Sequence, residues 1–249
     1  MPELPEIQAH AERLEHDLRG RVLARFTPLT FTALKTAVPP PDDAYGRPLR
    51  CVGRRGKYLL LDFGDTTFVI HLMQGGRLAH DEKRAAKPRG GQARFTFEPV
   101  ERDDGSIEER ALLLTEQGTE RRAGVWCVTS SELADTDPLS ALGPEATEIT
   151  AEELTARFAE HPMRIHGFLR DQRAISGIGR RLANEICHRA RVSPFATTTR
   201  LGAEGAALVV PAIRACIAES LAEERARPAM SSSKDRTSNV HQRTAAGFR

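Results

Sequence analysis

The chain has 249 residues, of which 40% are hydrophobic and 28% charged. This length and composition fit a globular protein of two modest domains. Because no run of about 18 apolar residues occurs, and the acidic start lacks the basic and apolar regions of a signal peptide, we expect a cytoplasmic location. The net charge of +2 is too small to argue for nucleic acid, and four scattered cysteines offer no local metal-ligand pair.

The first predicted element is an amphipathic helix whose apolar residues recur at spacings of three and four: Leu4, Ile7, Ala11, Leu14 and Leu18. Pro2 and Pro5 are expected in its first turn, where a missing N–H costs nothing. Removal of Met1 would expose the secondary amine of Pro2, a plausible nucleophile with a reference pKa of about 8. The simpler alternative is that prolines start helices well.

Glu3 and Glu6 lie beside this amine in the sequence. A carboxyl group there is suited to moving a proton during the opening of a sugar ring. Alternatively, acidic residues in a first turn only stabilise the helix through its dipole.

Residues 20–130 are predicted to form an antiparallel sandwich or barrel, because short alternating segments are separated by Gly, Pro, Asp and Asn. We expect strands at 21–27, 49–52, 58–63, 67–72, 93–97, 111–115 and 125–129. The basic turn from Arg54 to Tyr58 would place Lys57 near a phosphate or a reaction centre, although hairpin tips are also basic for solubility alone.

Two glycine-containing loops lie at strand boundaries, and the first of them ends a strand that is expected to be buried. The segment from His71 to Arg77 contains Gln74, and the glycines after it permit a close approach of the backbone to a duplex. The segment from Arg121 to Gly124 contains Arg121 and Arg122. It is expected either to contact a duplex in the same way or to have a purely structural role. For His71, the alternative is an ordinary hydrogen-bonding histidine at a strand end.

Residues 135–150 are predicted to be a linker, and Thr150 with Glu153 forms a capping box that opens a helix over 151–160. The chain beyond is predicted to be helical to about residue 227, followed by a polar tail. The sequence DQRAISGIGRRLA from Asp171 to Ala183 predicts a helix, a hairpin with Gly177 and Gly179, and a second helix. Backbone amides at its start, with Arg180 and Arg181, are suited to holding a phosphate.

Taken in order, PELPE, GRRGKYLLL, HLMQGGRL, ERRAGVW and LRDQRAISGIG resemble the formamidopyrimidine-DNA glycosylase and endonuclease VIII family. The resemblance covers nearly the whole chain to about residue 245. It implies a DNA glycosylase with AP lyase activity, in base-excision repair of oxidised bases in damaged double-stranded DNA. Pro2 is then the nucleophile that forms a Schiff base, Glu3 the proton shuttle, Lys57 a phosphate contact that assists catalysis, and His71 a DNA contact.

The sequence departs from the family pattern in three places. Gln74, Arg121 and Ala123 stand where relatives often insert Met, Arg and Phe into the duplex, and Arg180 stands where many have asparagine. Residues 240–243 resemble the lead-in to a four-cysteine zinc ribbon, but no cysteine follows Cys216. We therefore expect no zinc and no other cofactor.

The expected fold class is α+β: an N-terminal antiparallel β-sandwich with a catalytic N-terminal helix, and a C-terminal all-α helix–two-turns–helix domain. The expected domains are 1–134, a linker at 135–150, the helical domain at 151–228 and a tail at 229–249. We expect a monomer with no membrane association. The alternatives are a damaged-DNA-binding protein with little turnover and a non-functional truncated product. The sequence does not select the lesion.

Overall fold

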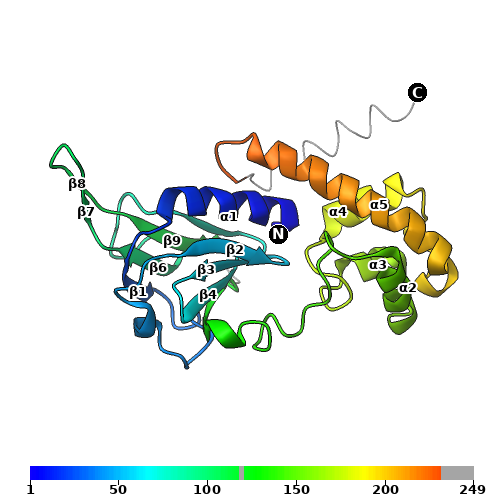
Figure 1. Cartoon of the computed structure of the whole chain (residues 1–249), viewed down its shortest axis with the longest axis horizontal. Coiled ribbons are helices and arrows are strands. Elements are labelled where there is room, and N and C mark those ends of the chain that lie inside the picture. Colours follow the sequence, from blue (N-terminus) through cyan, green and yellow to red (C-terminus); the bar gives the residue numbers. More distant parts are fainter. Residues whose placement is uncertain (118–120, 231–249) are drawn as a thin grey trace.

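Two antiparallel four-stranded sheets form the N-terminal part of the computed structural model, which describes residues 1–117 and 121–230 (Figure 1). Their strand orders are β1-β6-β9-β5 and β10-β4-β3-β2. The strands are β1 (Leu23–Pro28), β2 (Cys51–Arg55), β3 (Tyr58–Asp62), β4 (Thr66–His71), β5 (Gly76–His80), β6 (Gly91–Phe97), β9 (Ala111–Glu116) and β10 (Gly124–Thr129). The predicted antiparallel sandwich is confirmed.

Aromatic side chains from the two sheets meet in the middle of the sandwich. The ring of Phe68 on β4 lies 5.2 Å from that of Phe95 on β6 and 5.4 Å from that of Phe26 on β1, measured between centroids. All three side chains are buried. The alternating pattern of the strands produces this core, because every second side chain of a strand points to the same face.

The strand β5 and a small ribbon of β7 (Val100–Glu101) and β8 (Ile107–Glu108) are absent from the sequence prediction. The segment of β5, GRLAH, contains one large apolar residue, Leu78, and its first two residues belong to the predicted glycine loop. It is a strand because it pairs with β9 along its whole length. Pairing with a distant strand leaves no local signal in the sequence.

Helix α1 (Leu4–Leu18) lies along the sandwich and packs against β2 and α5 (Thr198–Arg225). Its N-terminus lies where the sandwich faces the helical domain (Figure 1). Glu3 is its N-cap, so Pro5 lies in the first turn as predicted, whereas Pro2 precedes the helix. The expectation for Pro2 was wrong because a reciprocal capping box between Glu3 and Glu6 starts the helix after it.

The C-terminal part is helical, and its hairpin lies between α3 (Ile165–Arg170) and α4 (Arg180–Arg189). The first helix of the motif ends at Arg170, so residues 171–176, which were predicted to belong to it, are not helical. Thr150 and Glu153 form the predicted capping box at the start of α2. The helices are α2 (Ala151–Glu160), α3 (Ile165–Arg170), α4 (Arg180–Arg189) and α5 (Thr198–Arg225), and two short 3-10 helices, η1 (Pro41–Ala44) and η2 (Ser130–Glu132), lie in the N-terminal part and at its end.

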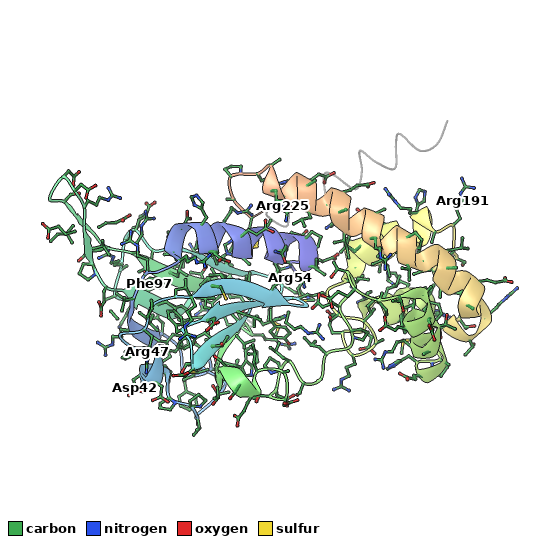
Figure 2. The ribbon with its side chains drawn as sticks, in the orientation of Figure 1. Asp42, Arg47, Arg54, Phe97, Arg191 and Arg225 are labelled. Carbon is green, nitrogen blue, oxygen red and sulfur yellow. The ribbon has the colours of Figure 1, made fainter. Side chains whose placement is uncertain are left out.

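Helix α5 connects the two parts of the molecule, because it packs against α2 and α4 and also against α1. Arg225 is its last residue (Figure 2). The guanidinium of Arg225 bonds the carboxylate of Glu12 on α1 at 2.6 and 2.8 Å. By length and composition α5 is long and apolar enough to cross a membrane, but core helices of globular proteins also meet this criterion. Its contacts are those of a core helix. The predicted tail from residue 231 onward lies outside the described residues.

Candidate active site

The N-terminal segment of the chain is bound to the hairpin of the helical domain. Pro2 and Glu3 are buried, and the backbone N–H of Leu4 donates to the carbonyl of Gly177 at 3.0 Å. An ideal β-carbon at Gly177, where φ is +99°, would lie 2.6 Å from Cδ1 of Leu4. Glycine at this position therefore permits both the left-handed backbone and the close approach of the first residues.

The carboxylate of Glu3 lies at the N-terminus of α4. Its Oε1 accepts the backbone N–H of Arg181 at 2.9 Å, and its Oε2 accepts that of Leu182 at 3.0 Å. These are N–H groups that the helix itself leaves without partners, and an anion there is stabilised by the helix dipole. The hairpin thus fixes the candidate proton shuttle in position beside Pro2.

The position of Glu3 bears on the prediction that the amides at the start of α4 bind a phosphate. Two of the amides at the start of α4 hold Glu3 instead of a phosphate. The amides of Gly179 and Arg180 bond no acceptor within the described residues, and the Arg180 side chain is exposed without an ion pair there. The guanidinium of Arg181 turns inward, toward Glu6 and Glu185. DNA contacts by Gly177, Gly179, Arg180 and Arg181 stay predictions.

Lys57 is only 3% exposed, although it lies in the turn between β2 and β3. Burial lowers its pKa to about 8, the carboxylates of Glu3 and Glu6 oppose this effect, and the nearby Arg170 adds to it. The ammonium group therefore lies within electrostatic reach of Glu3. Sequence reasoning missed Arg170, which ends α3 and is exposed.

The two arginines before Lys57 hold the turn against the linker. Glu145 accepts hydrogen bonds from Arg54 at 2.5 Å, from Arg55 at 2.6 Å and from the backbone N–H of Gly56 at 2.6 Å. Arg54 lies at the junction of the two parts of the molecule (Figure 2). Both arginines of the turn are therefore paired with Glu145. Glu145, which the sequence did not single out, orients the turn that carries Lys57.

His71 ends β4 close to Lys57. Its Nδ1 accepts the backbone N–H of Met73 at 3.2 Å, and its ring packs 4.5 Å from that of Tyr58, centroid to centroid. Burial lowers its pKa to about 4, with further lowering by the positive charges of Lys57 and of the chain's terminal amine, here on Met1. His71 is therefore neutral at pH 7. Lys57, His71 and the chain terminus share one site.

The two predicted loops flank this site. Gly124 at the start of β10 pairs with His71 at the end of β4, so the loop before Gly124 and the loop after His71 are neighbours. Gln74, Arg121 and Arg122 are exposed on these loops, while Ala123 is buried. Their predicted insertion into a duplex stays a prediction.

Met73 and Lys35 near these loops were missed by sequence reasoning. Met73 has φ of +50°, which is unusual for a residue with a side chain. Lys35 covers Gly124, where an ideal β-carbon would lie 2.3 Å from its Cε. No sequence pattern indicates where these two residues lie. Lys35 is positioned by backbone pairing with Val125 on β10, and Met73 by the turn after β4.

No group of three or more potential metal ligands occurs among the described residues. Cys127, Cys187 and Cys216 are buried and Cys51 is exposed, all as free thiols. Burial is the main cause that raises the pKa of Cys187 and Cys216 to about 11, so these thiols are uncharged at pH 7. The described residues do not fit a zinc ribbon.

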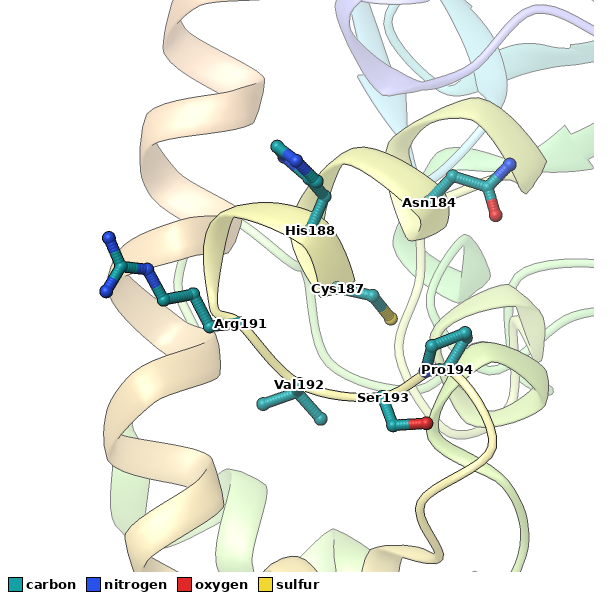
Figure 3. A pocket seen from close by; sticks show the side chains of 7 residues that line it. All are labelled: Asn184, Cys187, His188, Arg191, Val192, Ser193 and Pro194. Carbon is teal, nitrogen blue, oxygen red and sulfur yellow. The ribbon is translucent and has the colours of Figure 1, made fainter. Parts of the chain in front are cut away.

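An open pocket of about 690 Å³ lies at the C-terminal end of α4, lined by residues between Asn184 and Pro194 (Figure 3). None of the predicted site residues lines it. The candidate active site is instead at the N-terminal end of the same helix, where the two parts of the molecule meet.

Comparison with known proteins points to one family. The model of the formamidopyrimidine-DNA glycosylase N-terminal domain matches residues 1–116, and that of the H2TH domain of the same glycosylase matches residues 141–232. Formamidopyrimidine-DNA glycosylases from Chloroflexus aurantiacus and Thiobacillus denitrificans are 31% and 33% identical to the chain. The matches cover 90% and 89% of this chain and 78% of each relative.

Solved structures share the fold. The MutM (Fpg) protein from Thermus thermophilus superposes with a TM-score of 0.72 and 25% identity, covering 89% of this chain and 76% of that one. A formamidopyrimidine-DNA glycosylase from Lactococcus lactis, bound non-covalently to DNA containing an AP site, superposes with a TM-score of 0.74. Its identity is 17%, and the match covers 90% of this chain and 83% of that one.

Proposed function

Because the chain belongs to the formamidopyrimidine-DNA glycosylase family, we propose that it removes oxidised bases from damaged double-stranded DNA and then cuts the strand. Its nucleophile is Pro2, which becomes the terminal residue once Met1 is removed. The observation that carries this proposal is the gathering of the chain terminus, Glu3, Lys57 and His71 in one largely buried site between the two parts of the molecule.

Pro2 acts by nucleophilic catalysis. The ring nitrogen attacks C1′ of a nucleotide flipped out of the duplex, and the bond from C1′ to the ring oxygen of the sugar breaks. Glu3 passes the proton of the attacking amine to that oxygen, which opens the sugar. The base then leaves with the electron pair of its bond to C1′ and takes a proton from water, so that an iminium between Pro2 and C1′ remains. Loss of a proton from C2′ then allows elimination of the 3′ phosphate, which is the lyase step.

Lys57 and His71 fit supporting roles in the same reaction. The ammonium of Lys57 is positively charged near pH 7 and attracts a phosphate next to the flipped nucleotide. The imidazole of His71 is neutral and offers one N–H donor without adding charge beside the amine. The charge of Lys57 also favours an uncharged nucleophile, because nearby positive charges lower the pKa of an amine.

Borohydride trapping on duplexes with an abasic site, an oxidised purine or an oxidised pyrimidine tests this function. The wild-type protein should give a covalent adduct, and Pro2→Gly should give none. Pro5→Ala is the matched control, since Pro5 lies in the first turn of α1 but is not the terminal residue. Failure of the wild type on every duplex, or retention of Met1 in the mass spectrum, would reject the mechanism.

The same panel separates the alternative of a damaged-DNA-binding protein with little turnover. Tight binding to a lesion duplex without any cleavage would favour that alternative. We also propose that the protein acts as a monomer and without zinc. Elemental analysis that finds stoichiometric zinc would contradict the second point. The cytoplasmic location stays a prediction.

A further inference from the structure

Arg181 joins three helices through its side chain. Its Nη2 donates to Oε1 of Glu6 on α1 at 3.1 Å, and its Nη1 donates to Oγ of Ser220 on α5 at 3.1 Å. Nη1 also bonds Glu185, one turn further along α4, at 3.3 and 3.4 Å. Only 17% of the side chain is exposed. A guanidinium in this position is a fixed structural cation and not a mobile surface charge.

Arg181, Glu3 and Glu6 form a closed ring of hydrogen bonds, called here the Arg181 ring. The backbone N–H of Arg181 donates to Oε1 of Glu3 at 2.9 Å, and the backbone N–H of Glu3 donates to Oε2 of Glu6 at 2.9 Å. The side chain of Arg181 completes the ring at Oε1 of Glu6. One residue thus fixes Glu3 twice: directly through its amide, and through Glu6 by its guanidinium.

The charges of the ring require such a partner. Glu3 is 4% exposed and Glu6 is 1% exposed, and two adjacent buried carboxylates repel each other unless cations compensate them. Burial opposes the charge on Arg181, but Glu6 and Glu3 outweigh that effect and raise its pKa. Arg181 therefore stays charged and supplies one of the compensating cations, while Lys57 supplies the other.

We propose that Arg181 is a positioning residue for base removal, which holds the carboxylate of Glu3 against the helical domain by closing the Arg181 ring. The inference rests on the proposed function, since it assigns Glu3 the transfer of the proton to the sugar. It also gives Arg181 a role different from the DNA contact expected from the sequence. Without the ring, Glu3 keeps its place in the chain but loses its fixed orientation.

The test compares Arg181→Met with the wild type in two reactions. The first reaction is release of the base, measured on the oxidised duplex that the wild type cuts fastest. This reaction requires the proton from Glu3. Trapping on a preformed abasic site depends less on it, because the sugar there already opens to an aldehyde without an enzyme. Base release in single turnovers should fall about 30-fold, since small displacements of catalytic groups cost about that much or more. Trapping should fall by less than about threefold.

Two further variants control the experiment. Arg189→Met removes an arginine from the same helix that pairs with Glu219 at the surface, and it should leave both reactions unchanged. Arg181→Lys keeps the buried charge but not the forked geometry. Base release should therefore fall about 3- to 10-fold, again with a smaller loss in trapping. This variant keeps the proposal testable if Arg181→Met does not fold. Binding to a duplex with a tetrahydrofuran site should stay within about threefold, because Arg181 makes no phosphate contact in this proposal.

Wild-type rates of base release in Arg181→Met would overturn the inference. So would an equal loss of both reactions accompanied by a lower melting temperature, which would mean a structural role only. Unchanged base release together with much weaker binding would show that Arg181 contacts DNA after all. Absence of any adduct with the wild type would instead remove the proposed function, and this inference with it.

Discussion

Oε1 of Glu3 stands in the space that a side chain at residue 179 would need: an ideal β-carbon on Gly179 would lie 2.4 Å from it. The atom is held there by the amide of Arg181. Residue 179, the second glycine of the hairpin, must therefore lack a side chain, because Glu3 from the N-terminus occupies that space. The geometry of the candidate active site therefore depends on how the two parts of the molecule pack against each other.

Gly179→Ala should displace the carboxylate of Glu3 from the start of α4. Because the clash is with a group bonded to two backbone amides, we expect base release to fall about 100-fold. Gly53→Ala is the matched control, since an ideal β-carbon there meets nothing within 4 Å. Single-turnover rates of both variants on the same duplex check the prediction, and equal rates would contradict it.

The rate of strand cleavage should decline as the pH rises through about 8. The pKa of Lys57 is lowered to about 8, chiefly by burial, so the ammonium loses its proton and its attraction for phosphate above that pH. Lys57→Arg should move the decline to much higher pH, because a guanidinium stays protonated up to about pH 12. The measurement is the cleavage rate across the neutral and alkaline range. An identical decline in both proteins would assign it to another group.

Acid should unfold the protein partly through two buried histidines. His10 bonds the carbonyl of Leu78 at 2.8 Å, and burial lowers the pKa of His10, as of His71, to about 4. The unfolded chain binds more protons between about pH 6.5 and 4, so the free energy of unfolding falls as the pH falls through this window. Each histidine should contribute up to about 3 kcal/mol of this loss.

Urea unfolding at several pH values checks the contribution of His10. His10→Gln should flatten the acid dependence, whereas His16→Gln, at a side chain that is 88% exposed, should not. Parallel pH curves for the wild type and His10→Gln would show that other groups cause the loss of stability.

Glu145→Ala should destabilise the protein more than the loss of a surface ion pair does. Glu145 is bonded to Arg54, Arg55 and Gly56, and its side chain is only 10% exposed. Its removal leaves two half-buried arginines without their carboxylate, at a cost on the order of 3 kcal/mol. Glu219→Ala breaks an exposed pair with Arg189 and should cost less than about 1 kcal/mol. Equal losses in urea unfolding would contradict the prediction.

The sequence predicts much of the fold because the signals involved are local. The spacing of Leu4, Ile7 and Leu14 defines the first helix, and alternation defines most strands of the sandwich. The capping box of Thr150 and Glu153 marks the start of α2. The strand β5 and the position of Pro2 outside the helix could not be predicted, since the first depends on pairing with β9 and the second on a reciprocal cap at Glu3.

For the candidate site, the sequence by itself determined which residue types are present and their order: a proline after Met1, an acid beside it, a lysine in a turn, and a glycine hairpin. Only the tertiary structure decided what these residues contact. It turned Arg181 inward to Glu6, bound Arg54 and Arg55 to Glu145, and placed Glu3 on the amides of α4. The physical reason is that hydrogen bonds and charge compensation between residues up to 179 positions apart depend on how the two parts of the chain pack.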